Sequence, residues 1–510
     1  MAVRQPLVEA MLQYREQQVY PLHTPGHKGG RGMAEPLKSQ LGLPALALDV
    51  SLMAELDDIH QPEGCLKEAQ ELAAKLYGSE ACFFAVNGTT EAIHALLLTA
   101  LNPGEQVLIP RNAHRSVEGA LILADAHPIY VWPEYVPEFG LSGQITATQV
   151  EQELSAHPQV KAVFVTSPNY YGLAADVAAI AKIAHAHGAV LLVDEAHGPH
   201  LGFNRDLPPS GLQSGADACA QSTHKIVGAM TQCSMLQVQG KRLDLQRAAD
   251  VMSLLTTTSP NYLLMASLDA ARAQLEERGR EMETAALRCA QVLRTALATL
   301  PGLKILDQQV VGHAGIAAVD LTKVTVNFRT WGLSGVKVAA WLREHKLAVE
   351  LADAENVLFL VTYADATPAW PEIVARIVDA LQKLRQQNCD GEKSSAPQNL
   401  SGHPNFVPPN SGGEKNSADA NLCTQLPHVQ PQVSPRQVFY GAKETVPLTQ
   451  AAGRICAESV AFYPPGIPVV AAGEVVTPEL IAYCQEMLRL NLVVHGAADA
   501  TLQTLRVLRA

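Results

Sequence analysis

Residues 189–198 read AVLLVDEAHG, an apolar run that ends on two acidic residues. Short apolar runs bounded by polar residues are typical of strands that are buried on both faces of a sheet. Four such runs precede this one: CFFAV (82–86), QVLIP (106–110), PIYVW (128–132) and KAVFVTS (161–167). Among them lie segments with helical apolar spacing: TEAIHALLLTAL (90–101), SVEGALILADA (116–126) and VAAIAKIAHAHG (177–188). The alternation predicts an α/β fold with a mainly parallel sheet that helices cover on both faces.

The rest of the chain divides around this α/β region. The N-terminal stretch is polar and rich in turns, and the glycines of HTPGHKGGRG (23–32) exclude a helix there. A long helix is expected at 261–299. Residues 387–436 are rich in Ser, Asn, Gly and Pro and nearly free of apolar residues, which predicts a disordered linker. The expected organisation is an N-terminal arm (1–35), a major α/β domain (36–260), a connecting helix with a small α/β domain (261–386), the linker (387–436) and a C-terminal α+β domain (437–510).

Composition and charge narrow the class of protein. The 510 residues contain 38 Lys+Arg against 50 Asp+Glu, a net charge of −12. Such a chain binds polyanions poorly, so we expect neither nucleic acid nor an anionic membrane as a partner, whereas a cationic substrate would suit it. The nine cysteines are scattered without a C-x-x-C pair, which indicates free thiols in a reducing compartment, and no metal site is expected. We expect neither a signal peptide nor a membrane span, and therefore a cytoplasmic protein.

Two residues at expected strand ends are candidates for covalent chemistry. Asp194 ends the run VLLVD, where open α/β sheets place their ligands. Lys225, the last residue of QSTHK (221–225), follows Ser222 and His224 and precedes the apolar stretch IVGAM. A semi-buried lysine has a lowered pKa, and its neutral amine is a nucleophile. The plainer alternatives are a carboxylate that only caps a turn and a lysine that is only solvated.

A third strand end is followed by NGTTE (87–91), which opens an expected helix. Gly88 allows a ligand to approach the backbone closely, and Thr89 and Thr90 contribute hydroxyls. The free N–H groups and the helix dipole favour an anion such as a phosphate. The plainer alternative is an ordinary helix N-cap.

Three histidines lie close to these segments in the sequence. His114, in RNAHRS (111–116), follows another strand end, where it could lie over a planar ring. His197 follows Asp194 by three residues, and His224 directly precedes the candidate lysine. Each of them also fits the role of a polar residue with satisfied hydrogen bonds.

Taken together, these residues meet the demands of the cofactor pyridoxal 5'-phosphate (PLP). A PLP enzyme needs a lysine for covalent attachment, an acid that keeps the pyridine nitrogen protonated, a cradle for the phosphate and a group that holds the ring flat. The chain presents the phosphate loop, the ring-stacking histidine, the acid and the lysine in this order, each at a strand end of one sheet. We therefore predict a PLP enzyme in which Lys225 carries the cofactor.

At the level of longer motifs, the chain resembles the fold-type-I Orn/Lys/Arg decarboxylases, in the short bacterial form without a wing domain. The matching stretches are LHTPGHKGG (22–30), ELDDIHQPEGCLKEAQELAAKLYG (55–78), FFAVNGTTEAIHA (83–95), IPRNAHRS (109–116), SPNYYG (167–172), VDEAHGPHLGF (193–203), QSTHK (221–225), TTTSPNYLLMASLD (256–269) and PLTQAAGRICAESVAFYPPGIPVVAAGE (447–474). The resemblance covers nearly all of the chain outside the expected linker. It implies a major domain like that of aspartate aminotransferase, with PLP as cofactor.

The resemblance also implies roles for the candidate residues. It makes Lys225 the Schiff-base lysine, Asp194 the partner of the pyridine nitrogen and His114 the residue that stacks on the ring. His197 would lie near the phenolic oxygen of the ring or the substrate carboxylate. The catalytic set is Lys225, Asp194, His197 and His224. The phosphate is assigned to Gly88, Thr89, Thr90, Ser222 and His224.

Family members are dimers or assemblies of dimers with active sites at the interface. The resemblance therefore implies a homodimer or a larger assembly, with the HTPGHK arm and the Asp57–Asp58 pair near the interface. The candidates for substrate contact are His27, Asp58 and Glu474, and the two carboxylates would face the cationic end of the substrate.

The implied reaction is decarboxylation of a basic L-amino acid in polyamine metabolism. Arginine and lysine, which give agmatine and cadaverine, are placed ahead of ornithine, which gives putrescine. Two alternatives stay open: another fold-type-I PLP enzyme, such as an aminotransferase or a lyase, and a catalytically silent paralogue with a binding role. Aminotransferases usually hold the α-carboxylate with a late arginine, whereas the late motif here is PPGIP with a glutamate.

Three positions depart from the family pattern. Asn169 stands in SPNYYG where Thr is expected, and AAGE (471–474) lacks the usual Pro before its glycine. The third departure is the long insertion at 387–436. We expect the first to tune the site and the other two to affect the packing of the C-terminal domain.

Overall fold

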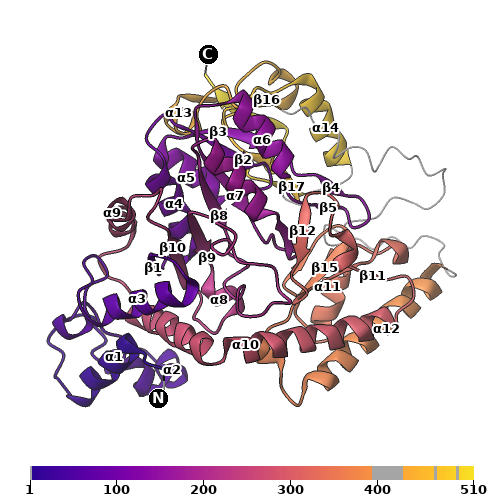
Figure 1. Ribbon diagram of the computed structural model, residues 1–510. Coiled ribbons are helices and arrows are strands. Elements are labelled where there is room, and N and C mark those ends of the chain that lie inside the picture. The colour runs from indigo at the N-terminus through magenta and orange to yellow at the C-terminus, as the bar shows by residue number, and fades with distance from the viewer. Residues whose placement is uncertain (1–2, 393–428, 464–467, 490–492, 510) are drawn as a thin grey trace.

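The computed structural model describes residues 3–392, 429–463, 468–489 and 493–509 (Figure 1). Its centre is a seven-stranded sheet in the order β1-β10-β9-β8-β6-β2-β3. These strands are β1 (Ala81–Ala85), β2 (Gln106–Pro110), β3 (His127–Val131), β6 (Val160–Thr166), β8 (Val190–Asp194), β9 (Ala218–Gln221) and β10 (Ser234–Val238). Strands β3, β2, β6, β8 and β9 pair in parallel, and β10 pairs antiparallel with β9 and β1. The predicted mainly parallel sheet is confirmed, and all five strands expected from apolar runs belong to it.

Helices cover both faces of this sheet. One face packs against α1 (Pro6–Glu16), α3 (Cys65–Tyr77), α6 (Ala147–Ala156), α7 (Val177–Ala186) and the first part of α10 (Tyr262–Ala298). The other face packs against α4 (Gly88–Ala100), α5 (Ser116–Ala124) and α9 (Leu245–Leu255). Side chains alternate along each strand, so Leu191 and Val193 join the first layer while Val190 and Leu192 join the second. By the same alternation, Asp194 ends β8 on the side of α4.

One edge of the sheet collects the segments that carry the candidate residues. Strand β1 runs in the same direction as β9, because both are antiparallel to β10. The carboxyl ends of β1, β9, β8, β6, β2 and β3 therefore lie at the same edge. Helix α4 starts after β1, and the short helix α8 (Thr223–Ile226) starts after β9. The fold thus brings the phosphate loop, the acid and the lysine to one edge.

A smaller domain follows along α10, which Figure 1 shows running along the bottom of the molecule. Its antiparallel sheet has the order β11-β13-β15-β14. The strands are β11 (Lys304–Ile305), β13 (Lys323–Asn327), β14 (Leu351–Ala352) and β15 (Asn356–Leu360), and the helices are α11 (Gly335–Glu344) and α12 (Trp370–Glu392). These elements share a core of their own with the end of α10. Strand β12 (Ile316–Val319) pairs with β7 (Leu173–Ala175), which joins this domain to the segment after β6.

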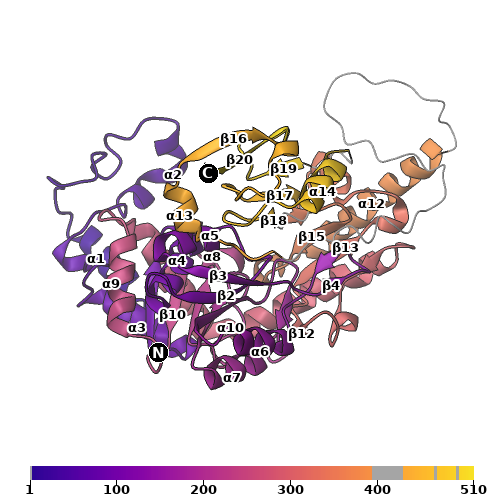
Figure 2. The same ribbon diagram turned by 90° about the horizontal axis from the view of Figure 1, so that it is seen from above.

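The C-terminal domain packs on α5, as Figure 2 shows. Its elements are α13 (Pro435–Tyr440), β16 (Lys443–Pro447), β17 (Val460–Tyr463), β18 (Pro468–Val470), α14 (Pro478–Arg489), β19 (Val493–His495) and β20 (Thr504–Leu508). Its apolar side chains form a separate core. None of the helices described for this chain is long and apolar enough to cross a membrane.

The structure corrects two expectations about the segments outside the sheet. The N-terminal arm contains a helix, α1, because Leu7 and Met11 lie one turn apart and both are buried against α3 and α10. The expected linker is shorter than 387–436 at both ends. Helix α12 continues to Glu392, and Gln430 exchanges two side-chain hydrogen bonds of 2.8 and 2.9 Å with the backbone of Tyr130. Residues 393–428, which made up most of the expected linker, lie outside the described residues.

Candidate active site

Lys225 projects from α8 toward a histidine and an aromatic ring. Its Nζ lies 3.0 Å from Nε2 of His197 and 5.2 Å from the ring centroid of Tyr170. Burial lowers the pKa of the Lys225 amine from its ordinary value, while the charges of Asp194 and Glu350 raise it. A lysine with a lowered pKa has more of its amine in the neutral, nucleophilic form at neutral pH.

Asp194 is buried at the end of β8, with 3% of its surface exposed. Within the described part of the chain, its carboxylate receives one hydrogen bond, from the N–H of Ala196 at 3.1 Å. Burial raises the pKa of Asp194 to about 6, against the opposing effects of that N–H and of Lys225. A buried carboxylate with so few partners is suited to a cationic group, because a nearby positive charge restores its ionised form.

The phosphate loop is held in shape by a buried glutamate. Glu91 accepts hydrogen bonds from the N–H groups of Val86 and Asn87 at 3.1 and 3.0 Å. Gly88 has a φ of +70°, which favours glycine, and it begins α4. Among the described residues, the N–H groups of the next two residues, Thr89 and Thr90, have no acceptor. These two donors at a helix N-terminus match the requirements of a phosphate.

A short segment that sequence reasoning missed joins the phosphate loop to the lysine loop. The carbonyl of Gln232 accepts the N–H of Gly88 at 2.9 Å, and the carbonyl of Cys233 lies 2.9 Å from Nδ1 of His224. The hydroxyl of Ser234 lies 3.1 Å from that of Thr89. Residues 232–234 contact both loops because β10 runs between β1 and β9. A strand that follows the lysine by nine residues offered no sequence signal for this role.

The other histidine expected near the ring is His114, in the loop after β2. Its Nδ1 lies 2.8 Å from the hydroxyl of Ser116. Burial, together with the charges of Lys225 and Arg115, lowers the pKa of His114 to about 4. His114 is therefore neutral at pH 7 and lies within electrostatic range of the candidate lysine.

Tyr170 forms a wall of the site that sequence reasoning did not single out. Its ring centroid lies 4.5 Å from that of His197, at an interplanar angle of 55°. The side-chain oxygen of Asn169 accepts the N–H groups of Tyr171 and Leu173 at 3.0 and 3.1 Å, so Asn169 shapes the turn that carries this wall. The hydroxyl of Tyr171 donates to Oδ2 of Asp353 at 2.6 Å, which fastens the turn to the small domain.

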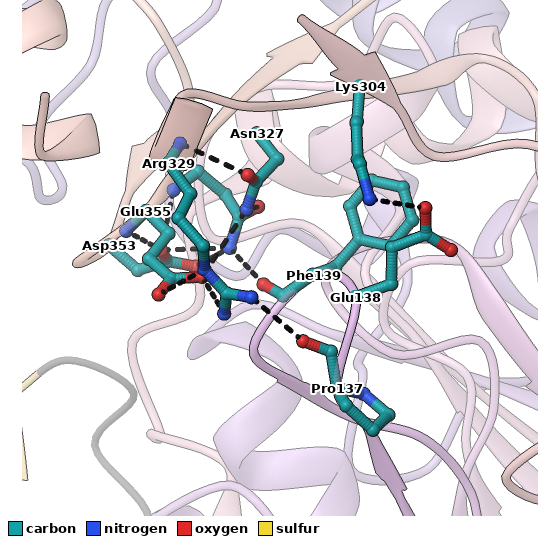
Figure 3. A network of polar contacts seen from close by, with 9 residues as sticks. Pro137, Glu138, Phe139, Lys304, Asn327, Arg329, Asp353 and Glu355 are labelled. Atoms are coloured by element: carbon teal, nitrogen blue, oxygen red, sulfur yellow. Dashed lines mark hydrogen bonds and ion pairs between the residues drawn. The ribbon is translucent and has the colours of Figure 1, made fainter. Parts of the chain in front are cut away.

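The small domain also forms hydrogen bonds to a hairpin of the major domain (Figure 3). The hairpin strands are β4 (Tyr135–Val136) and β5 (Leu141–Ser142). Arg329 donates to the carbonyl of Pro137 at 3.2 Å, and Asn356 donates to the carbonyl of Phe139 at 2.8 Å. Asn356 also donates to both carboxylate oxygens of Asp353, at 2.9 and 3.0 Å. Asp353, which holds Tyr171, is thus itself held by Asn356, and Asn356 also contacts the major domain.

Two of the residues expected to contact the substrate, His27 and Asp58, have hydrogen-bond partners away from Lys225, His197 and Asp194. Nε2 of His27 lies 3.0 Å from Oδ2 of Asp49, and its Nδ1 accepts the N–H of Gly30 at 3.0 Å. Asp58 accepts the N–H of His60 at 2.9 Å and lines an open cleft of about 430 Å³. The single chain described here shows no contact of either residue with Lys225.

The third, Glu474, requires a correction, because its carboxylate is already neutralised. It is 2% exposed and forms a fork with Arg111, with N–O distances of 2.8 and 2.9 Å. Oε2 also accepts the N–H of Ala471 at 2.8 Å. Nε of Arg111 donates to the carbonyl of Pro468 at 3.1 Å. Glu474 therefore anchors the C-terminal domain to the end of β2, and in this chain it offers no unpaired charge to a substrate.

We expect the variant Glu474→Gln to lose stability. Removing one charge of a buried pair leaves Arg111 uncompensated and costs about 3 to 5 kcal/mol. The thermal midpoint should fall clearly below that of the parent and of Glu479→Gln, which alters an exposed glutamate on α14. An unchanged midpoint together with a strongly raised KM would instead support contact between Glu474 and the substrate.

The fold and the site together define the class of this protein. A mainly parallel sheet presents a nucleophilic lysine, a buried acid and a helix terminus with free donors at one edge, where such sheets bind ligands. These are the groups that PLP requires, and the residues present fit it. The protein is a PLP-dependent enzyme with a fold-type-I major domain.

The comparison with family models then gives the family. Residues 5–368 match the Orn/Lys/Arg decarboxylase major domain, and residues 416–494 match the Orn/Lys/Arg decarboxylase C-terminal domain. The chain belongs to the Orn/Lys/Arg decarboxylase family, and it is a PLP-dependent decarboxylase of basic amino acids. Membership in this family favours decarboxylation over the aminotransferase and silent-paralogue alternatives.

Relatives match over nearly the whole chain. An arginine decarboxylase of Bacillus anthracis is 37% identical over 508 residues, covering 99% of this chain and 97% of that protein. An arginine decarboxylase of Bacillus subtilis is 35% identical over 99% of this chain and 98% of its own. The inducible lysine decarboxylase of Escherichia coli is 24% identical over 93% of this chain and 75% of its own.

Solved structures show the same fold at lower identity. Lysine decarboxylase A from Pseudomonas aeruginosa superimposes with a TM-score of 0.81 at 22% identity, covering 99% of this chain and 80% of that one. The Francisella novicida lysine decarboxylase LdcF gives a TM-score of 0.80 at 21% identity, covering 99% and 81%.

Proposed function

We propose that this enzyme converts L-arginine to agmatine and CO₂, with Lys225 as the residue that binds PLP covalently. The observation that supports the chemistry is the group formed by Lys225, His197 and the buried Asp194 at one edge of the sheet. The observation that supports arginine is the similarity, at 35 to 37% identity over 99% of the chain, to relatives named arginine decarboxylase. Relatives named lysine decarboxylase are 24 to 26% identical.

PLP supplies an electron-accepting ring system, which takes up the electron pair left when the substrate loses CO₂. The residues of this chain would bind PLP, orient the substrate against it and transfer protons beside it. Lys225 provides the amine, and burial increases its neutral fraction by lowering its pKa. Asp194 provides the anion that holds a proton on the pyridine nitrogen. His197 lies within hydrogen-bond distance of the lysine amine and can pass a proton to it or take one from it.

We infer the roles of the other site residues toward PLP from their positions. The N–H groups of Thr89 and Thr90 would bind the phosphate, with Gly88 giving room and with Ser222 and His224 on the adjoining loop. His114 would lie against the ring as a neutral imidazole. The hydroxyl of Thr89 is held beside the lysine loop through Ser234.

We also propose a dimer as the working unit. The segment between α1 and α2 (Leu37–Leu46) loops out from the body in Figure 2. It and α2 expose apolar side chains, with Leu22 at 88%, Leu43 at 55% and Leu41 at 49%. Exposed apolar groups of this kind favour burial against a partner. His27 lies in the same segment, and its contact with substrate would require a second copy of the chain. A cytoplasmic location remains a prediction from the scattered cysteines.

The substrate is tested with purified enzyme and equal concentrations of arginine, lysine and ornithine, with agmatine, cadaverine and putrescine separated as products. We expect kcat/KM for arginine to exceed that for the other two by at least about a hundredfold, because an arginine-specific site leaves polar groups unpaired around a shorter amine. Cadaverine as the main product would make the enzyme a lysine decarboxylase.

A further inference from the structure

Lys323 is a buried lysine close to the candidate active site, and the roles proposed above do not use it. It is the first residue of β13 and is 0% exposed. Its Nζ has no hydrogen-bond partner among the residues that the structure describes. An ammonium group removed from water at this depth costs several kcal/mol unless a polar group receives it. Its position therefore points to an acceptor nearby.

His197 offers an acceptor of the right kind. Its Nε2 faces Lys225 at 3.0 Å, whereas its Nδ1 is buried and has no hydrogen-bond partner in the described part of the chain. Burial lowers the pKa of His197 well below the ordinary imidazole value, and the charge of Lys323 lowers it further, more strongly than that of Lys225. The charge of Lys323 therefore acts on an imidazole whose Nδ1 is open to a hydrogen-bond donor.

The path of the Lys323 side chain agrees with this placement. Its Cβ and Cγ lie against Gly172, where an added Cβ would come within 3.1 and 2.9 Å of them. Gly172 ends the turn that begins at Asn169 and carries Tyr170, whose ring packs 4.5 Å from the His197 ring. Lys323 and His197 therefore contact the same short turn.

We propose that Lys323 is a positioning residue that donates a hydrogen bond to Nδ1 of His197 through one buried water, and so fixes the imidazole as its Nε2–H tautomer. The hydrogen bond at one ring nitrogen decides which nitrogen carries the proton. With Nδ1 occupied as an acceptor, Nε2 carries the proton and presents it toward Lys225. The inference rests on the proposed roles of Lys225 and His197.

The fixed tautomer gives the proton transfer a direction. When the Nε2 proton passes to the lysine amine or to the substrate carbon, the ammonium proton of Lys323 can pass to Nδ1. The imidazole then stays neutral throughout, which avoids the cost of a buried charge on it. One proton moves at each nitrogen, so the step balances.

The charges around Lys323 keep it protonated. Burial lowers the pKa of Lys323 to about 8, with Asp320, Glu350 and Glu283 raising it and Lys225 lowering it. Asp320 is itself held by Nε2 of His200 at 3.1 Å. At pH 7 the group is therefore an ammonium that can donate.

The direct test reads the tautomer in the full-length holoenzyme without substrate. ¹⁵N NMR of histidine-labelled enzyme distinguishes a protonated from an unprotonated ring nitrogen, and a His197→Gln spectrum identifies the signals. We expect the parent to show the Nε2–H tautomer and Lys323→Met to lose it. A parent in the Nδ1–H tautomer would overturn the proposal, even if Lys323→Met failed to fold.

Kinetics provide a second readout. Lys323→Met should lower kcat by roughly tenfold to a hundredfold, at or below the lower end of the range for loss of a general acid or base, with little change in KM or PLP content. The matched control is Lys337→Met, which alters an exposed lysine on α11 and should behave like the parent. A Lys323→Met enzyme with parental kcat and tautomer would contradict the proposal. Because the tautomer is read without substrate, a different substrate preference would leave this result standing.

Discussion

Lys225→Ala should abolish decarboxylation and the covalent attachment of PLP. The side chain is the one lysine amine that the structure places 3.0 Å from His197 and beside the ring of Tyr170. Without it the substrate must react with free PLP, and the positioning that the site supplies is lost. We expect kcat to fall by at least about a thousandfold, equivalent to about 4 kcal/mol of transition-state stabilisation.

The measurement is CO₂ release together with visible absorbance of the purified variant. Lys337→Ala is the matched control, because it removes an exposed lysine from the small domain. It should keep both the activity and the absorbance of bound PLP. A Lys225→Ala enzyme with activity within tenfold of the parent would show that another amine carries the cofactor.

The second large effect is expected for Asp194→Asn. The carboxamide has nearly the same shape but no charge, so it cannot hold a proton on the pyridine nitrogen. We expect turnover to fall by at least about a hundredfold, because a buried charge that acts on the transition state is worth several kcal/mol. PLP should still bind, since the phosphate loop contributes independently. Near-parental turnover would mean that Asp194 only caps a turn.

Although Asp194→Asn should lower turnover, it should raise the stability of the cofactor-free protein. Burial raises the pKa of Asp194 to about 6, above its ordinary value of 3.8. Ionisation therefore destabilises the fold progressively between pH 4 and pH 6, and above pH 6 the full cost is about 3 kcal/mol. Without PLP, Asp194→Asn should unfold at a higher temperature than the parent at pH 7.5, with the difference vanishing near pH 4. Asp206→Asn, at an exposed position, should show no such trend.

The sheet and the order of its site segments could be predicted from the sequence because both depend on local patterns. Apolar runs mark buried strands wherever they occur, and parallel strands necessarily bring their carboxyl ends to one edge. Asp194 and Lys225 could therefore be placed at the same edge although 31 positions separate them. The spacing of Leu7 and Met11 is compatible with the helix α1, but the polar composition of the arm led to the prediction of a loop.

Contacts between distant segments could not be predicted in this way. Arg111 and Glu474 are 363 residues apart, and nothing in either local sequence indicates that they pair. Lys323 lies in a short strand that reads as ordinary small-domain core. Tyr170 sits in a turn whose orientation depends on the Tyr171–Asp353 hydrogen bond to the small domain. Such contacts depend on how the domains pack, which a sequence pattern does not contain.

The identity of the lysine that binds PLP tests the account most directly. Borohydride reduces the C=N bond between the cofactor and its lysine, and peptide mapping by mass spectrometry then locates the pyridoxyl group. We predict a single modified peptide, labelled at Lys225. Lys323 is the informative alternative, because it is a buried lysine with a lowered pKa whose charge acts on the same histidine. A label on Lys323, or on any lysine other than Lys225, would contradict the site described here.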